Sequence, residues 1–221
     1  MTITGSHTRT AGRLVALGAD VDYHEAWELQ CHLMRRRADG AIPDTLLLLE
    51  HAPVYTAGRR TLPEHVTGEL NAPLVETDRG GQLTYHGPGQ LVGYPIVSLG
   101  ERRIGPKTYV RVLEASIVQA LARFDVDAHT EDGLTGVWTE RGKIAAIGVR
   151  ISRGVAMHGF ALNVTTDLSA YEPIIACGLP DRPVTSMGAI ISSPPEVREV
   201  GDAVADALGA MLGTDWNRAS L

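Results

Sequence analysis

The sequence lacks the features that assign a chain to several familiar classes. It has no run of eighteen apolar residues, so we expect no membrane-spanning helix. Its first ten residues contain no apolar core, and we therefore expect no secretory signal in that stretch. Its net charge is −6, whereas domains that bind nucleic acid are usually basic. We expect neither a membrane nor a nucleic-acid partner.

Cysteine is scarce, and the two cysteines, Cys31 and Cys177, could form at most one disulfide. Without a secretory signal we expect a reducing, cytoplasmic environment and two free thiols. No CxxC, HExxH or clustered carboxylate motif is present, so neither a metal nor another cofactor is indicated. The phosphate-binding motif GxxxxGK[ST] is also absent, as is a GxGxxG motif between a strand and a helix.

The chain does contain an unusual glycine-rich stretch, RGGQLTYHGPGQLVGYP, from Arg79 to Pro95. Its five glycines and two prolines interrupt what otherwise has the pattern of a strand. Two explanations stay open from the residues alone. The glycines could mark the turns of a hairpin. They could instead allow a ligand to lie directly against the backbone.

The overall pattern indicates an α+β fold, with a mixed β-sheet and helices packed on the outside. An apolar content of 44% in 221 residues is enough for one large core, and no linker-like tract divides the chain. We expect a flexible arm over residues 1–20 and a single domain over residues 21–215.

Local periodicity places the main elements. Apolar residues at helical spacing predict helices over residues 22–40 and 106–124, and a last helix after Pro194-Pro195. A short apolar run predicts a buried strand over 45–50, and alternating segments with short turns predict a three-stranded meander over 136–164.

The two cysteines occur in different surroundings. Cys31 falls on one apolar helical stripe with Tyr23, Trp27 and Met34, which favours the role of a small core hydrophobe. Cys177 lies in the proline-rich segment YEPIIACGLPDRPVTS, where a long helix is unfavourable. A thiol in a loop is more accessible, so Cys177 is a candidate nucleophile, with a buried inert thiol as the alternative.

A cysteine nucleophile needs a neighbouring base or cation to ionise at neutral pH. Three residues are candidates: His86, His158 and Lys143. The chain has only two lysines, Lys107 and Lys143, against eighteen arginines. Lys143 begins an apolar strand, where its stem would be partly buried. Each candidate also has a purely structural interpretation, and the residues alone do not choose among them.

Three segments, RGGQLTYHGPGQLVGYPI, GVW…KIAAIGVRI…HGFALNV and ACGLPDRPVTSM, together resemble the octanoyltransferases of lipoate biosynthesis, the lipoate–protein ligase B family. The match runs in order from about Tyr23 to Met187. The resemblance implies a catalytic acyltransferase domain similar to those of lipoate and biotin protein ligases. It implies transfer of an octanoyl group from octanoyl-acyl carrier protein to a lysine of apo lipoyl domains, by way of a cysteine thioester.

The resemblance also implies roles for particular residues. Cys177 is the implied nucleophile and Lys143 its partner, a cysteine–lysine dyad. The implied acyl site is lined by Arg79, Gly80, Gly81, Gln82, Leu83, Thr84, Tyr85, His86, Ala146, Ile147, Gly148, Gly159, Phe160 and Ala161. Small residues there would leave room for an eight-carbon chain, whose burial is worth roughly 0.8 kcal/mol per methylene.

The implied protein partners are the octanoyl-acyl carrier protein and, as acceptors, lipoyl domains of 2-oxoacid dehydrogenase complexes and the glycine cleavage H protein. No oligomer is required, and we expect a monomer. Because acyl carrier proteins are acidic, we expect a local basic patch for docking. The candidates are Arg59, Arg60, Arg79, Arg150 and Arg153.

Three other functions stay open from the sequence. The first is an ATP-dependent lipoate ligase of the same fold. The second is a thioesterase that pairs a cysteine with His86 or His158. The third is a carrier or sensor that binds acyl chains without turnover.

Overall fold

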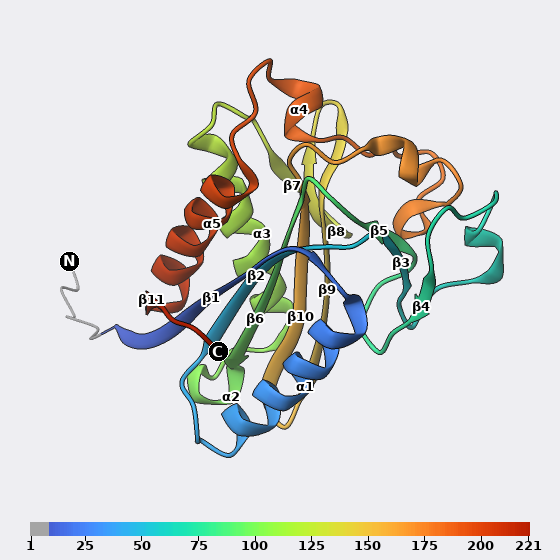
Figure 1. The fold of residues 1–221 in the computed structure, drawn as a ribbon. Helices are drawn as coiled ribbons and strands as arrows, with labels where there is room; N and C mark the ends of the chain where they lie inside the picture. Colours follow the sequence, from blue (N-terminus) through green and yellow to red (C-terminus); the bar gives the residue numbers. More distant parts are fainter. Residues whose placement is uncertain (1–8) are drawn as a thin grey trace.

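The computed structural model describes residues 9–221 (Figure 1). The strands are β1 (Thr10–Val21), β2 (Thr45–His51), β3 (Val54–Ala57), β4 (Leu74–Glu76), β5 (Thr84–His86), β6 (Gln90–Ser98), β7 (His129–Glu131), β8 (Leu134–Thr139), β9 (Gly142–Ser152), β10 (Val155–Asn163) and β11 (Thr214–Arg218). The α-helices are α1 (Tyr23–Ala38), α2 (Leu99–Arg102), α3 (Pro106–Ala122), α4 (Met187–Ile190) and α5 (Val197–Leu212). Single 3-10 turns occur at Pro63–His65, Leu168–Tyr171 and Ala176–Gly178.

One large mixed sheet organises the molecule, in the strand order β11-β1-β2-β6-β10-β9-β8-β7. The β1 pairs with β2 and β11 are parallel, and the others are antiparallel. Helices α3 and α5 cover one face and α1 covers the other (Figure 1). The α+β prediction with outer helices is confirmed.

The leucine run of β2 shows why the sheet needs covering on both faces. Successive strand residues point to opposite faces. Leu46 and Leu48 belong to the core beneath α3 and α5, whereas Leu47 and Leu49 belong to the core beneath α1. A strand buried on both sides is therefore apolar at nearly every position, as the sequence indicated.

The predicted helices begin where local chemistry favours a helix start. The Asp22 carboxylate accepts a hydrogen bond from the Glu25 backbone N–H at 3.0 Å and caps α1. Pro106 occupies the first turn of α3, where no backbone donor is needed. Cys31 on α1 packs partly buried against the core beneath that helix.

The expectation of a flexible arm over residues 1–20 is wrong for residues 10–20. Residues 10–20 are not a free arm, because they form most of β1, which lies between β11 and β2. Residues 1–8 of the predicted arm lie outside the described residues. The expected domain boundary at residue 215 also falls inside β11, whose register with β1 starts at Thr10 opposite Thr214.

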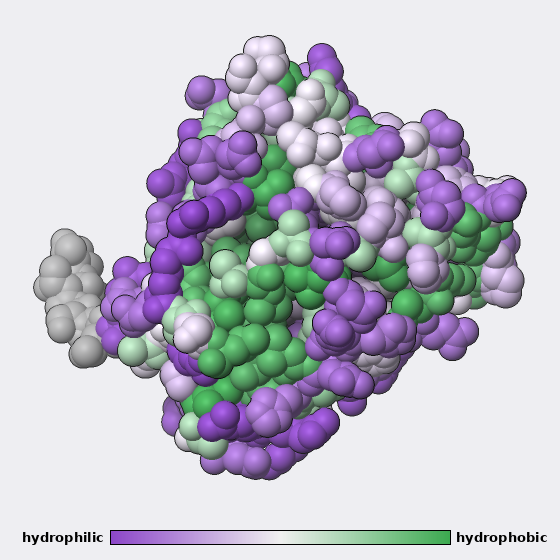
Figure 2. All heavy atoms as spheres, viewed as in Figure 1, coloured by the Kyte–Doolittle hydropathy of each residue, from purple (hydrophilic) through white to green (hydrophobic). Residues whose placement is uncertain are grey.

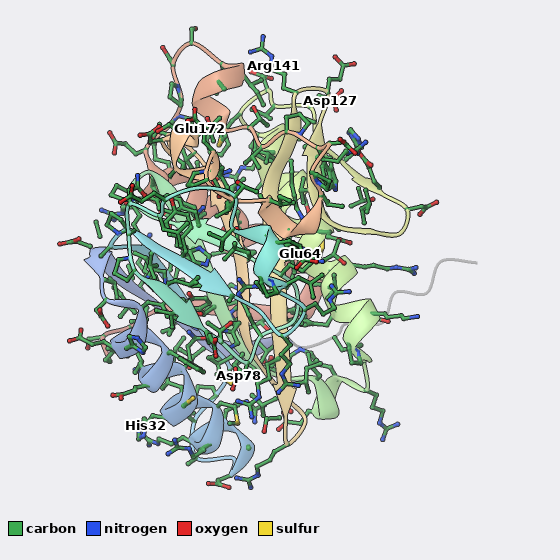
Figure 3. The ribbon with its side chains drawn as sticks, turned by 90° about the vertical axis from the view of Figure 1, so that its right-hand side faces the viewer. His32, Glu64, Asp78, Asp127, Arg141 and Glu172 are labelled. Carbon is green, nitrogen blue, oxygen red and sulfur yellow. The ribbon has the colours of Figure 1, made fainter. Side chains whose placement is uncertain are left out.

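A smaller sheet, β4-β3-β5, lies beside the large one and holds the start of the glycine-rich stretch. Tyr55, Leu83 and Tyr85 of this region form a small core with Ala170 and Ile174. That core fastens the segment after β10 to the small sheet. Figure 3 looks onto this side of the molecule, with Glu64 above Asp78 in the view.

Within residues 9–221 no helix is both long and apolar enough to cross a bilayer. Figure 2 shows that green, apolar atoms gather in the lower middle of one face, with hydrophilic residues around them. No group of three or more metal-ligating side chains occurs in the described part of the chain.

Candidate active site

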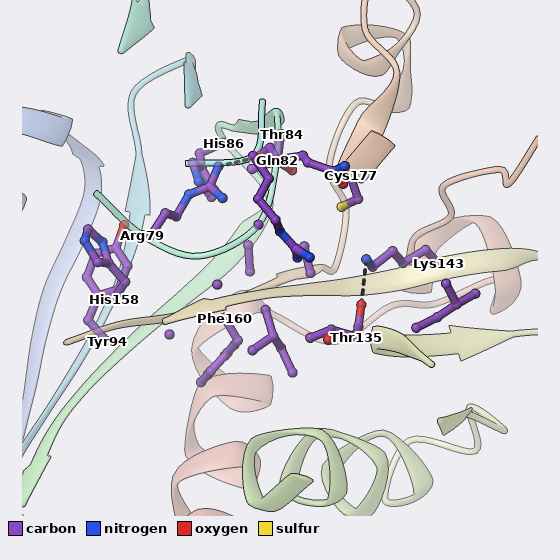
Figure 4. A pocket seen from close by; sticks show the side chains of 18 of the residues that line it. Arg79, Gln82, Thr84, His86, Tyr94, Thr135, Lys143, His158, Phe160 and Cys177 are labelled. Atoms are coloured by element: carbon purple, nitrogen blue, oxygen red, sulfur yellow. Dashed lines mark hydrogen bonds between the residues drawn. The ribbon is translucent and has the colours of Figure 1, made fainter. Parts of the chain in front are cut away.

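A cavity of about 200 Å³ opens between the glycine-rich stretch and the β9–β10 hairpin. It brings together segments that lie far apart in the sequence, and Cys177 and Lys143 both line it. In Figure 4 these two residues lie at one end of the cavity, whereas Tyr94 and His158 lie at the other. The cavity therefore has a thiol-and-amine end and an aromatic end.

Cys177 is the middle residue of the 3-10 turn Ala176–Gly178 and has left-handed backbone angles, φ 56° and ψ 16°. A residue other than glycine in that region costs about 1–3 kcal/mol and persists only where its surroundings hold it. The Cys177 backbone N–H donates to the Leu83 carbonyl at 2.8 Å, which holds the turn against the glycine-rich stretch. The side chain is partly exposed and both cysteines are free thiols.

Lys143 lies on β9 and is only 7% exposed. Its Nζ donates to the Thr135 carbonyl at 2.9 Å and lies 5.2 Å from the centre of a Trp138 ring. Figure 4 shows the amine directed across the cavity towards the Cys177 sulfur. No hydrogen bond joins the two groups in the part of the chain that the structure describes.

Backbone pairing fixes the position of the Cys177 loop relative to Lys143. The Lys143 N–H donates to the Pro183 carbonyl at 2.8 Å, and the Thr185 N–H donates to the Lys143 carbonyl at 2.9 Å. Pro183 is six residues from Cys177 along the chain. The strand that carries the amine thus directly anchors the loop that carries the thiol.

Arg79 organises the other wall. The residue is 7% exposed, and Nη2 donates to the Thr56 carbonyl and hydroxyl, both at 2.7 Å, and to the Gln82 carbonyl at 2.9 Å. Burial lowers the pKa of Arg79, and nearby Tyr23 and Cys177 oppose that effect. Arg79 forms no ion pair with a carboxylate among residues 9–221. It clamps the turn that leads into Gln82.

Comparison with known proteins gives the family. The model of the lipoyl protein ligase A/B catalytic domain matches residues 22–209. The chain belongs to that family. It is 48% identical over 208 residues to an octanoyltransferase of Mycobacterium leprae, covering 89% of this chain and 88% of that one. It is 46% identical over 201 residues to an octanoyltransferase of Chloroflexus aggregans, covering 87% and 91%.

Solved structures share the fold of this family member. A lipoate protein ligase described as putative, from T. acidophilum, matches with a TM-score of 0.72 at 16% identity, over 96% of this chain and 89% of that one. The biotin protein ligase from Aquifex aeolicus in complex with biotin and ATP matches with a TM-score of 0.58 at 16% identity, over 90% and 70%. The expected relation to lipoate and biotin ligase catalytic domains is thus confirmed at the level of fold.

The predicted wall residues of this lipoyl ligase family member divide by strand alternation. Gln82, Thr84 and His86 line the cavity, together with Arg79 and Gly81. The intervening Leu83 and Tyr85 do not, because they point to the other side of the strand and into the small core. Gly80 does not line the cavity either, and its N–H donates to the Val149 carbonyl at 2.9 Å. Of the stretch from Arg79 to His86, these three residues do not line this cavity, and the acyl site itself stays a prediction.

The predicted residues of the β9–β10 hairpin all line the cavity: Ala146, Ile147, Gly148, Gly159, Phe160 and Ala161. The reason for the glycines differs from the one expected. A Cβ on Gly148 would lie 2.7 Å from the Gly80 carbonyl, and one on Gly159 would lie 2.2 Å from the Gly93 carbonyl. Close backbone packing, and not only room for a chain, requires glycine at both positions.

Several cavity residues were missed by sequence reasoning: Tyr23, Arg60, Tyr94, Gly133, Leu134 and Thr135. Tyr23 and Tyr94 fall in patterns typical of core residues, and no local signal separates a core tyrosine from one at a cavity. Thr135 acts through its carbonyl, which no side-chain motif reveals.

The histidines do not serve the thiol. His86 is bonded at both nitrogens, to Gln90 at 2.7 Å and to Thr56 at 3.2 Å. His158 Nε2 contacts Asp78 at 3.0 Å, and the ring lies at the cavity end opposite Cys177 (Figure 4). Burial lowers the pKa of His86 well below its usual range and that of His158 to about 4. A cysteine–histidine pair is therefore not supported.

The expected basic patch is only partly present. Arg59 and Arg60 are exposed, and Arg60 lines the cavity. Arg79 is buried, whereas Arg150 pairs with Asp78 and Arg153 pairs with Asp39 at 2.8 Å. Three of the five predicted arginines thus have other roles.

Proposed function

We propose that this member of the lipoyl protein ligase A/B family transfers an octanoyl group through a thioester on Cys177, with Lys143 as the proton carrier. Octanoyl transfer is the activity in the names of its octanoyltransferase relatives. The observation that supports the cysteine route is the placement of Cys177 and Lys143 at the same end of one cavity. A thiol and an amine at one end of a cavity are the groups that thioester exchange requires.

The first half-reaction forms the acyl-enzyme. The Cys177 thiolate attacks the thioester carbonyl of octanoyl-acyl carrier protein, and a new carbon–sulfur bond forms. The tetrahedral intermediate collapses when the bond to the pantetheine sulfur breaks. The departing thiolate takes a proton from the Lys143 ammonium. The octanoyl group is then joined to the Cys177 sulfur as a thioester, and Lys143 is neutral.

The second half-reaction delivers the chain to an acceptor. A lysine amine of a lipoyl domain attacks the Cys177 thioester, and Lys143 takes the proton that the amine loses. The carbon–sulfur bond breaks, which regenerates the Cys177 thiolate and leaves an octanoyl amide. Conversion of a thioester to an amide is downhill, so the cycle needs no ATP.

The wall of the cavity suits an alkyl chain. Ile147, Phe160, Ala161 and Leu134 provide apolar surface along it. Burial of a methylene there contributes roughly 0.8 kcal/mol. This supports a medium-length acyl chain as the cargo.

The proposed partners are an acyl carrier protein as donor and lipoyl domains as acceptors, including those of 2-oxoacid dehydrogenases and the glycine cleavage H protein. A T. acidophilum lipoate protein ligase of the same fold is described with its E2 lipoyl domain. One chain supplies both proposed catalytic groups, which supports a working monomer. The proposed compartment is a reducing one such as the cytoplasm, where the nucleophilic thiol of Cys177 would stay reduced.

The experiment is multiple turnover with octanoyl-acyl carrier protein and an excess of lipoyl domain, without ATP. Mass spectrometry of the lipoyl domain should show one octanoyl group per domain and more product than enzyme. A parallel reaction with ATP and free octanoate should give neither acyl-adenylate nor product. Product that depends on ATP would contradict the proposal, as would bulk release of free octanoate.

A further inference from the structure

Attack on a thioester creates negative charge on the carbonyl oxygen, and donors aimed at that oxygen are usually a large part of catalysis. The backbone donors next to Cys177 are already in use. The Cys177 N–H donates to the Leu83 carbonyl at 2.8 Å, and the Gly178 N–H donates to the Ile175 carbonyl at 3.2 Å. The Leu179 N–H donates to the Ala176 carbonyl at 3.1 Å. The oxyanion therefore needs a donor from elsewhere.

The Gln82 side chain lies at this place. A Cβ built on Gly178 would fall 2.4 Å from Gln82 Nε2 and 2.6 Å from Oε1, so the amide rests directly on the residue after the nucleophile. Gly178 has a φ of +67° and no side chain, which leaves the space that the amide occupies. Figure 4 shows Gln82 reaching towards Cys177 from the opposite segment.

The side-chain amide of Gln82 has no hydrogen-bond partner in the described residues, whereas its backbone is held by Arg79. Among residues 9–221, its side-chain nitrogen and oxygen make no hydrogen bond to the protein, and the residue is partly exposed at the cavity. Its backbone is fixed, because its carbonyl accepts from Arg79 Nη2 at 2.9 Å. A donor that is positioned by its backbone and unbonded at its tip is suited to a ligand oxygen.

Other donors at the cavity are less suited. Both terminal nitrogens of Arg79 are bonded to protein oxygens, at Gly80, Thr56 and Gln82. Lys143 Nζ is bonded to the Thr135 carbonyl and carries the proton in the proposed cycle. Arg60 lines the cavity but is exposed, so its charge is screened by solvent.

We propose that Gln82 is a catalytic residue whose Nε2–H donates to the thioester oxygen while the tetrahedral intermediate exists. The inference rests on the proposed Cys177 thioester. As the thiolate attacks, the carbonyl electron pair moves to oxygen and accepts the Gln82 hydrogen bond. As the intermediate collapses, the pair returns to re-form C=O and the pantetheine sulfur leaves. No proton passes through Gln82, and the same contact serves the second half-reaction.

The test measures two reactions of the Cys177 thiol, acylation and alkylation, in the native chain and in Gln82→Met. Acyl-enzyme formation from octanoyl-pantetheine, a donor without a carrier protein, is followed by rapid quench and intact-mass analysis. Loss of one oxyanion donor should slow this step by about 100- to 1,000-fold. Alkylation of Cys177 by iodoacetamide across pH should match the native protein, because that displacement forms no oxyanion.

Two further variants make the result decisive. Gln82→Glu has nearly the same shape as the native side chain but no N–H donor, so it should slow acylation at least as much as Gln82→Met. It tests the donor independently if the methionine variant folds poorly. Gln119→Met makes the same change at an exposed position of α3, away from the cavity, and should acylate within a factor of a few of the native rate because it keeps the Gln82 amide. Native-like acylation of both Gln82 variants would overturn the proposal. It would also be overturned if Gln82→Met slowed alkylation and acylation equally, or if Gln119→Met lost as much acylation as Gln82→Met.

Failure of the proposed function gives a different result. If the native chain takes up no octanoyl group from octanoyl-pantetheine or from octanoyl-acyl carrier protein, the proposed acyl-enzyme on Cys177 is wrong. If the native chain acylates and the Gln82 variants acylate equally well, only the role of Gln82 is wrong.

Discussion

Acid should destabilise this fold through histidines that are buried in their neutral form. Burial lowers the pKa of His158 from 6.5 to about 4, against the opposing effect of Asp78. His51 shows the same shift to about 4, since burial outweighs its bond to the Val21 carbonyl. The unfolded chain binds these protons more readily than the folded chain does. The free energy of unfolding must therefore fall as the pH drops below 6.5 and stop falling from this cause near pH 4.

The size of the effect follows from the two pKa values. For one histidine that moves from 6.5 unfolded to about 4 folded, lowering the pH from 7 to 5 removes about 2 kcal/mol of stability. The perturbation is His158→Asn, since asparagine tolerates the left-handed backbone at this position, φ 56°. The variant lacks the titrating ring. Its free energy of unfolding should therefore fall by about 2 kcal/mol less between pH 7 and pH 5 than that of the native chain.

The assay is denaturant unfolding of both proteins at pH 7 and pH 5, followed by circular dichroism. The comparison uses the change between the two pH values, so an overall destabilisation of the variant cancels. His24→Asn, at an exposed position of α1, serves as the matched control and should follow the native pH dependence. Equal losses for His158→Asn and the native chain would refute the assignment of His158 as a buried neutral histidine.

The remaining predictions concern the Lys143 side chain and the glycine packed against it. Lys143→Met should lower octanoyl transfer by about 100- to 10,000-fold, because proton transfer is lost, while the exposed Lys107→Met should keep native rates in the same product assay. Gly136→Ala should also lower transfer, because its Cβ would lie 2.5 Å from Lys143 Cε and 2.6 Å from the Ala145 carbonyl oxygen, so the Lys143 side chain and the β9 backbone would have to shift. Gly154→Ala also places alanine at a positive φ, +75° against +128° at Gly136, but its nearest contact is 3.9 Å, so it should keep activity. Equal losses in both glycine variants would show that backbone strain alone is responsible.

Local patterns predicted the elements whose stability is local. Helices α1, α3 and α5 have periodic apolar faces, and Asp22 and Pro106 mark two of their starts. The β8–β9–β10 meander has short turns and self-contained pairing. In these segments the sequence neighbours are also the contacting neighbours, and a window of the chain carries the information.

Strand β1 was missed because its partners are distant. It pairs with β2 and with β11, about two hundred residues away, and its register shifts between Ala16 and Gly18 and again between Gly18 and Val21. Such irregularities break the alternation that marks a strand. The two glycines and the polar residues of this segment give it the pattern of a loop until the partner strands are known.

The site was only partly predictable for a related reason. The family resemblance placed Cys177 and Lys143, and the structure brings both to one cavity. The resemblance did not separate Gln82 and Thr84, which line the cavity, from Leu83 and Tyr85, which do not. Alternation of side chains along the strand would have separated the two pairs.

The decisive measurement is the mass of the native chain after mixing with octanoyl-acyl carrier protein in the absence of a lipoyl domain. We expect a gain of one octanoyl group, mapped by peptide analysis to Cys177 and removed by hydroxylamine. Cys31→Ser should acquire the same group, and Cys177→Ser should not acquire a thioester. An octanoyl group on Cys31, or full transfer activity in Cys177→Ser, would contradict a covalent route through Cys177.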